Sequence, residues 1–208
     1  MVTVTIESVH GTRNLLFQWI LANVVGLTLA MMSLAVIDRV GGEDGGLADG
    51  LSHLIGLALA GAAVGVLQWL VLRRMVYRAA WGILANSLAL PVGFILGYAL
   101  AGPPIDFFAA FVLLGILSGS VYWLVLRRQT CGAGWYALAS SVGWFLGGIA
   151  AILVGVALGD HVGAVIANET LGYLALLAFI GITGGLVGGT ITGVALARLV
   201  RSVIASTR

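Results

Sequence analysis

The sequence predicts an all-α integral membrane protein, a bundle of six transmembrane helices built as three helical hairpins that repeat in the same orientation. Three observations lead to this prediction. Of the 208 residues, 61% are apolar and only 9% are charged, whereas about a quarter of the residues of a soluble domain are charged. Long apolar stretches recur along the chain, with the arginines gathered between them. One hairpin pattern also occurs three times, at about 15–74, 78–128 and 133–201.

Six apolar stretches are long enough to cross the roughly 30 Å hydrocarbon core of a bilayer as helices. Their interiors contain no Asp, Glu, Lys, Arg or His. They are continuously apolar rather than alternating, which favours helices over the strands of a barrel. The predicted helices are Leu15–Ile37, Leu54–Leu72, Trp81–Leu100, Phe107–Leu126, Trp135–Leu158 and Leu174–Ala197.

The chain outside these stretches is short, so we expect a single membrane domain over residues 1–208. A polar leader, residues 1–14, precedes the first helix and is expected on the cytoplasmic side. The alternation of Val2, Val4 and Ile6 in the leader fits a frayed segment, a short strand or a contact arm. Residues 202–208 form a tail after the last helix.

The arginines predict the orientation in the membrane. With six crossings, nine of the ten arginines fall on one side and only Arg39 falls on the other. Because cytoplasmic loops carry the excess of basic residues, both termini are expected in the cytoplasm. Two arginine pairs on that side are candidate contacts for anionic lipid headgroups. These are Arg73, Arg74, Arg127 and Arg128.

The internal repeat is clearest in the second and fourth stretches. The segment GAAVGVLQWLVLRR at 61–74 aligns without gaps with GILSGSVYWLVLRR at 115–128. The sixth stretch carries a partial copy, in which the residues that align with Gly61, Gly65, Leu72 and Arg74 are Gly185, Gly189, Leu196 and Arg198. The first, third and fifth stretches also match, each with a tryptophan shortly before a small polar residue. This parallel repeat differs from the inverted repeats of many secondary transporters and predicts a pseudo-threefold axis along the membrane normal.

The motif Gln-Trp-Leu-Val-Leu-Arg-Arg at 68–74 resembles the repeated hairpins of multi-pass bacterial membrane proteins. The resemblance is best over residues 54–144. It implies the bacterial cytoplasmic (inner) membrane and brings no established activity with it.

Small residues at a spacing of four predict how the helices pack, because helices in lipid associate through the close approach that small residues permit. We expect this packing either within the chain or against a partner helix, a lipid tail or a pigment. The candidate packing face consists of Gly143, Gly147, Gly181, Gly185, Gly189 and Gly193.

Three polar residues, Asn23, Asn86 and Ser140, occupy matching positions in the first, third and fifth stretches. We expect them to form interhelical hydrogen bonds or, alternatively, a polar ring around the axis that a small neutral solute would pass. Pro91 predicts a kink in the third helix, with Ser87 bonding the freed carbonyl.

Tryptophans near the cytoplasmic ends of the predicted helices indicate an aromatic belt at that interface. They are Trp19, Trp69, Trp81, Trp123 and Trp135.

The sequence contains none of the usual signatures of membrane or soluble enzymes. It has neither a His-Glu-x-x-His motif nor a Gly-x-Ser-x-Gly motif, and Cys131 has no candidate base beside it. Proton-coupled transporters place ionisable groups within the membrane, and the predicted helices lack them. We therefore expect no catalytic, cofactor-binding or metal-binding residue and no nucleic-acid partner.

Two functions remain as hypotheses. The first is a non-catalytic membrane subunit or scaffold that packs through its glycine-rich faces against other membrane proteins or copies of itself in a larger assembly. The alternative is a channel or facilitator for a small neutral solute or lipid.

Overall fold

The computed structural model describes residues 8–40, 47–73, 76, 78–101, 106–127, 132–166 and 168–206. It confirms the all-α class, and each predicted apolar stretch lies inside one observed helix. The helices are α1 (Ser8–Val40), α2 (Leu47–Leu72), α3 (Trp81–Ala101), α4 (Asp106–Leu126), α5 (Gly134–Val165) and α6 (Glu169–Ser206).

The first and last helices extend beyond the predicted boundaries. Helix α1 begins at Ser8, so the second half of the predicted leader is helical, while Val2, Val4 and Ile6 lie outside the described residues. At the other end, α6 continues to Ser206 and takes in most of the predicted tail. The extension of α1 adds mainly polar residues, whereas the extension of α6 also contains apolar residues such as Leu199 and Ile204. Continuing a helix costs less than starting a new one, because nucleation is the unfavourable step.

Four helices contain a segment long and apolar enough to cross a membrane, which indicates a membrane protein. These segments are Asn14–Ser33, Gly50–Leu72, Gly134–Val162 and Glu169–Arg201. Helices α3 and α4 contribute the shorter apolar segments Trp81–Gly97 and Phe111–Leu126 within the described residues. Large apolar side chains cover the outside of the bundle as well as its interior, as Leu153, Val156 and Phe17 illustrate. A surface this apolar fits lipid rather than water.

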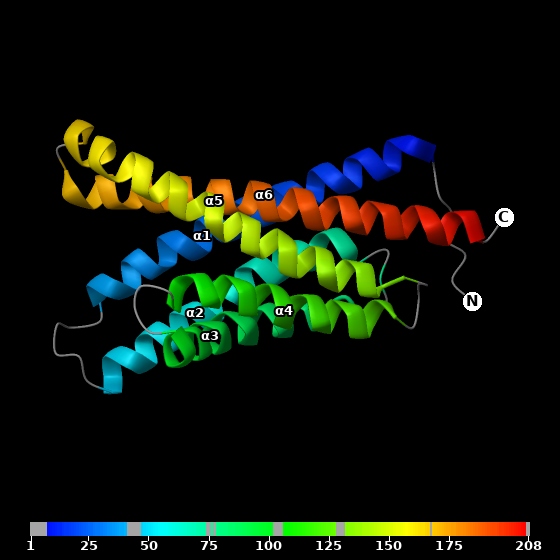
Figure 1. Ribbon diagram of the computed structural model, residues 1–208, viewed down its shortest axis with the longest axis horizontal. Coiled ribbons are helices and arrows are strands. Elements are labelled where there is room, and N and C mark those ends of the chain that lie inside the picture. Colours follow the sequence, from blue (N-terminus) through cyan, green and yellow to red (C-terminus); the bar gives the residue numbers. More distant parts are fainter. Residues whose placement is uncertain are drawn as a thin grey trace.

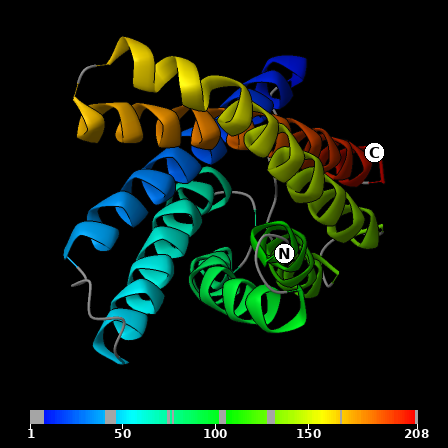
Figure 2. The same ribbon diagram turned by 60° about the vertical axis from the view of Figure 1, so that its left-hand side comes forward.

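The helices run alternately back and forth, and the start of α1 and the end of α6 lie at the same end of the molecule (Figure 1). Each helix packs along two others in cyclic order, from α1 to α6, and α6 packs against α1 to close the ring. Figure 2 shows α6 lying between α5 and α1. In the described residues no other pair of helices has its backbones in contact. Contacts between helices that are not ring neighbours therefore depend on side chains reaching the middle.

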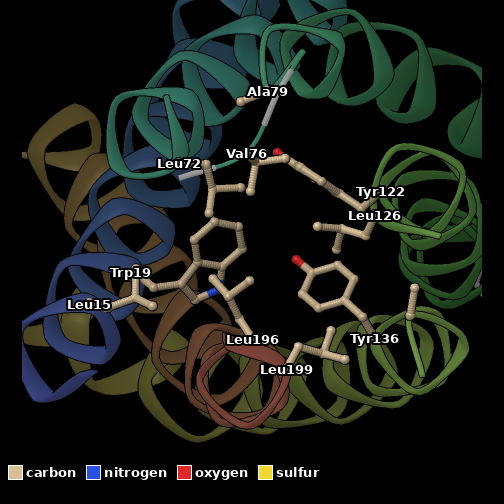
Figure 3. Close-up of a cluster of buried hydrophobic side chains, with 11 residues drawn as sticks. Leu15, Trp19, Leu72, Val76, Ala79, Tyr122, Leu126, Tyr136, Leu196 and Leu199 are labelled. Atoms are coloured by element: carbon tan, nitrogen blue, oxygen red, sulfur yellow. The ribbon is translucent and has the colours of Figure 1, made fainter. Parts of the chain in front are cut away.

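Two buried clusters fill the interior. The first cluster lies at the end where α1 begins and α6 finishes, and its side chains converge on a common centre (Figure 3). It contains Leu15, Trp19, Leu72, Val76, Ala79, Tyr122, Leu126, Ala133, Tyr136, Leu196 and Leu199. The second cluster contains Leu27, Ala30, Met31, Ala60, Val64, Ala89, Phe111, Leu114 and Trp144.

Helix α3 continues through Pro91, whose missing N–H leaves the carbonyl of Ser87 without its intrahelical partner. The prediction that the Ser87 hydroxyl bonds this carbonyl is wrong. Instead, the Ser87 hydroxyl donates to the carbonyl of Ala58 in α2 at 3.0 Å. The Ser87 side chain therefore links α3 to α2 and does not replace the hydrogen bond that α3 loses at Pro91.

Candidate functional site: a buried polar network between the helices

The side-chain amide of Gln68 in α2 is the centre of a buried polar network. Its Nε2 donates to Oδ1 of Asn23 in α1 at 2.9 Å. Its Oε1 accepts from Nδ2 of Asn86 in α3 at 3.1 Å and from the hydroxyl of Tyr122 in α4 at 2.8 Å. One amide thus links four helices. Because α2 and α4 are not ring neighbours, the bond from Tyr122 crosses the middle of the bundle.

The two asparagines are held by the same kind of hydrogen bond to their own helix. Asn23 Nδ2 donates to the carbonyl of Trp19 at 2.8 Å, and Asn86 Nδ2 donates to the carbonyl of Gly82 at 2.8 Å. Each bond reaches back four residues along its own helix, where a helical side chain naturally points. It fixes the amide, and in Asn23 it leaves the oxygen free to accept from Gln68. A Cβ at position 82 would overlap the Tyr122 hydroxyl, so glycine there gives this tyrosine room to reach the network.

Trp19 extends the polar contacts to α6. Its Nε1 donates to the hydroxyl of Thr192 at 2.9 Å, and that hydroxyl donates to the carbonyl of Gly188 at 2.7 Å. Trp19 is 0% exposed, so the prediction that it anchors the chain at the membrane interface is wrong. By contrast, Trp81 and Trp135 are 52% and 73% exposed, as an interfacial belt requires.

The three residues of the predicted polar axis do not bond one another directly. Asn23 and Asn86 meet through Gln68, which stands between them. Ser140 of α5 lies 3.4 Å, oxygen to oxygen, from Ser118 of α4. The three residues at matching positions are all buried, but a glutamine joins two of them and a second serine holds the third.

Three aromatic rings pack against one another in the middle of the bundle, beside this network. Trp19, Tyr122 and Tyr136 pack edge to face, with ring centroids 6.3, 6.4 and 5.6 Å apart, within the range in which such pairs attract. Leu72 and Leu196 point into the same centre (Figure 3). Side chains from all six helices, or from the turns that adjoin them, therefore fill this end of the axis.

The network is neutral and satisfied. Within the described residues every buried side-chain nitrogen and oxygen has a hydrogen-bond partner. In the same residues no group of three or more His, Cys, Asp or Glu side chains is placed to hold a metal ion. Amides, hydroxyls and an indole do not ionise near neutral pH. In a low-dielectric interior such a network fixes the arrangement of the helices, because breaking it leaves costly unpaired groups.

Glycine pairs bring neighbouring helices together at three places, which we call the glycine junctions. At the α2–α3 junction a Cβ on Gly65 would lie 2.6 Å from the Cα of Ile83, and a Cβ on Gly61 would overlap the carbonyl of Asn86. The other two glycine junctions involve Gly115 and Gly119 between α4 and α5, and Gly185 and Gly189 between α6 and α1. At each junction the neighbouring helix occupies the space of the missing side chain.

The predicted packing face lies against helices of the same chain. From α6, a Cβ on Gly181 would lie 2.5 Å from Thr28 Cα, and a Cβ on Gly185 would lie 2.6 Å from Val24 Cα. Gly189 and Gly193 face Asn23, Leu16 and Trp19 of the same helix α1. From α5, Gly143 faces the Gly188 carbonyl and Gly147 faces the Gly184 carbonyl. The described part of this stripe is therefore covered within the chain.

Two of the arginines proposed as lipid contacts, Arg73 and Arg127, lie at the end where α6 finishes. Arg73 stacks over the ring of Trp69 at 5.6 Å, and Arg127 stacks over the ring of Trp123 at 5.0 Å. Both arginines are exposed, whereas Arg74 and Arg128 lie outside the described residues. The stacking holds each guanidinium beside an interfacial ring, as cation–π pairs do.

Sequence reasoning placed Trp19 in the aromatic belt and Gln68, Tyr122 and Thr192 among the buried polar residues, but it assigned none of the four to a network. A signal for three of them is present in the repeat. Tyr122 aligns with Gln68, and Thr192 takes the same position in the partial copy in α6. Each copy therefore places a hydrogen-bonding side chain at one position of an otherwise apolar helix face. Trp19 carried no such signal, because its position near the start of a predicted helix is typical of an interfacial tryptophan.

No protein family, curated protein or solved structure matches the chain. Its function therefore has to follow from the geometry.

Proposed function

We propose that the protein is a non-catalytic subunit or scaffold of a larger membrane assembly. One observation carries this proposal: the buried polar side chains of the described residues are all hydrogen-bonded within the protein. Groups that are already satisfied and neutral are poor ligands for a substrate. The outer surface is then what the molecule offers to other molecules.

The proposed arrangement has six membrane crossings, with three hairpins around a pseudo-threefold axis. It is supported by the three glycine junctions, whose glycines align in the repeat and lie against the next helix in the ring each time. It is also supported by the leucines Leu72, Leu126 and Leu196, which align in the repeat and all belong to the first cluster. The arginine pattern supports cytoplasmic termini in a bacterial inner membrane.

The outer surface favours association through apolar side chains rather than through the glycine stripe of α6. The stripe contacts α1 and α5, whereas Leu186, Ile182 and Phe179 on the same helix are exposed. A small residue that already lies against one helix cannot also provide close approach to a second helix. A partner protein would therefore meet the outward face of α6 and its equivalents.

A channel for a small neutral solute is less well supported. The path that such a solute would take passes Gln68, Trp19 and Tyr122, which bond or pack against one another. A solute would have to replace these contacts one by one. The two hypotheses are nevertheless separable by experiment.

The test is purification of the full chain from its native membranes in a mild detergent. We expect one or more membrane proteins to accompany it at fixed stoichiometry. A photo-crosslinking amino acid at the exposed position Leu186 should capture a companion, whereas one at the fully buried Ala151 should not. A chain that runs alone and captures nothing from Leu186 would contradict the subunit proposal.

Reconstitution into proteoliposomes tests the channel. We expect neutral solutes such as glycerol to cross no faster than in protein-free vesicles. Flux that is present in the wild type and lost in the folded variant Asn86→Leu would favour the channel instead.

A further inference from the structure

A groove of about 700 Å³ lies between α5 and α6 at the end where α6 finishes. This volume is within the roughly 300–1,000 Å³ range of sites that hold small ligands. The residues that matter for its chemistry are Trp135, Ala139, Ile191, Val194, Ala195 and Arg198. Trp135, Val194 and Arg198 are exposed, so the groove opens on the outside of the bundle.

The groove exists because α5 and α6 meet at one level and part at another. They approach most closely where a Cβ on Gly147 would lie 2.8 Å from the Gly184 carbonyl. From that crossing they separate toward the end of α6 (Figure 1). The pocket lies on the separating side, between the start of α5 and the last turns of α6.

The sequence of α6 keeps the groove open. Val194 and Ala195 stand where the aligned copy in α2 has the larger Leu70 and Val71. In addition, α2 and α4 each carry a tryptophan that stacks under an arginine one turn later. The aligned positions of α6 hold Gly193, which faces α1, and Ala197, so α6 carries no such stacked pair.

The lining is mostly apolar, with the Thr190 hydroxyl, which donates to the carbonyl of Leu186 in its own helix, and with one basic residue, Arg198. Ala139, Ile191 and Val194 line the groove without hydrogen-bonding side chains, and the exposed Arg198 is among the lining residues nearest the end of α6. No carboxylate or carbonyl of the described residues pairs with Arg198. The described carboxylates of these two helices, Asp160 and Glu169, lie at their opposite ends. Within the described residues, the charge of Arg198 therefore has no paired counter-charge.

We propose that this groove binds one anionic phospholipid. An acyl chain lies along the apolar walls, and the phosphate of the headgroup pairs with Arg198. Trp135 sits at the level of the glycerol, where indoles gather at membrane interfaces. Basic pockets between membrane helices are known to take phosphate headgroups, and a guanidinium matches phosphate with two parallel hydrogen bonds. This site does not depend on the proposed subunit role.

The test uses phosphatidylglycerol with a diazirine in its acyl chain, in nanodiscs containing the full chain. We expect the cross-links to map by mass spectrometry to residues 190–199 of α6 and to the first turns of α5. Arg198→Gln should lower this labelling about fivefold, because one arginine near a membrane surface contributes a factor of that order to anionic-lipid binding. Val194→Trp, which fills the groove, should abolish it.

Two matched variants control for diffuse charge and for bulk. Arg201 is exposed on the same helix, and Arg201→Gln should leave the labelling unchanged. Leu70→Trp adds an indole at the aligned position of α2 and should also leave it unchanged. Should Val194→Trp fail to fold, the two arginine variants decide alone.

Three results would overturn the proposal. One is an equal loss of labelling in Arg198→Gln and Arg201→Gln, which would indicate diffuse attraction. Another is equal labelling by a diazirine phosphatidylcholine, which would remove the role of the anion. The last is competition by inorganic phosphate at millimolar concentration, which would indicate a phosphate site without a lipid chain.

Discussion

Where α2 meets α3, α4 meets α5 and α6 meets α1, the contact is made by glycines against the next helix. The helix pairs within the proposed hairpins meet differently each time. Gly26 of α1 faces the side chain and Cα of Val64 in α2, Gly82 of α3 faces the hydroxyl of Tyr122 in α4, and Gly147 of α5 faces the backbone of α6. The contact that recurs in every copy is thus one that requires the absence of a side chain. The contacts within the proposed hairpins vary: a side chain fills the gap in the first two, and backbone fills it in the third.

The difference follows from what holds helices together in lipid. Apolar burial adds little there, so close packing and hydrogen bonds remain. A junction of glycines lets two backbones approach along several residues, and neither backbone can move away without moving its whole helix. A side chain that fills a gap can rotate or shift by a few tenths of an ångström. We therefore expect the glycine junctions to tolerate substitution least.

The largest expected effect is at the glycine junctions. Gly61→Leu and Gly185→Leu should each lower the free energy of unfolding by about 3 kcal/mol or more, because the added side chain meets backbone rather than a movable group. The measurement is equilibrium unfolding in mixed micelles with increasing dodecyl sulfate. Gly50→Leu is the control, since nothing lies within 4 Å of a Cβ at that position. Equal effects at Gly50 and Gly61 would show that the junctions are not special.

The second-largest effect is expected in the buried polar network, which spans both a proposed hairpin and a glycine junction. Gln68 bonds Asn23 within a helix pair, Asn86 across a glycine junction and Tyr122 across the middle. Gln68→Leu should lower the free energy of unfolding by about 2 kcal/mol, since interhelical hydrogen bonds in membranes average about 0.6 kcal/mol each. The same unfolding assay measures it.

Gln18→Leu is the matched control for this loss. Gln18 is an exposed residue of α1 and lies outside the buried face that carries Asn23. Its replacement should leave the free energy of unfolding within about 0.5 kcal/mol of the wild type. A loss at Gln18 as large as at Gln68 would mean that the assay senses polarity in general rather than the network.

Much of the fold could be predicted because apolar length is a direct physical requirement. A helix that crosses a bilayer needs about 20 apolar residues, and that need is visible in the sequence without knowledge of contacts. The start of α1 at Ser8 was missed because the residues from Ser8 to Asn14 are polar, and only their continuity with an apolar helix makes them helical.

The network was less predictable because it depends on which residues meet across the ring. Matching positions singled out Asn23, Asn86 and Ser140, yet the side chains to which these residues bond lie on other helices. Gln68 joins two asparagines because it can donate and accept at once, a property of its amide that no spacing reveals. Trp19 shows the same limit: its place in the sequence fits an interface, and only the packing of α6 on α1 together with Tyr122 and Tyr136 buries it.

A smaller effect is expected where a single hydrogen bond joins α1 to α6. Thr192→Val removes the acceptor of the Trp19 indole and should lower the free energy of unfolding by about 0.6 kcal/mol, the average for such a bond. It should also shift the tryptophan fluorescence, because a buried indole loses its partner. Thr190→Val is the control, since the Thr190 hydroxyl bonds the carbonyl of Leu186 in its own helix and is exposed. The idea fails if both variants shift the fluorescence alike.

The smallest expected effect is at Gly26, within the first helix pair. A Cβ there would lie 3.1 Å from Val64 Cα and 3.2 Å from its Cγ2, so α2 must give way by a few tenths of an ångström. Against that cost stands the higher helix propensity of alanine, about 1 kcal/mol over glycine in a helix interior. The two nearly cancel, and Gly26→Ala should leave the free energy of unfolding within about 0.5 kcal/mol of the wild type. Gly61→Ala carries the same propensity gain but places its methyl group on the carbonyl of Asn86, so the same assay should show a clear loss. If the two alanine variants behave alike, the distinction between glycine junctions and side-chain contacts does not hold.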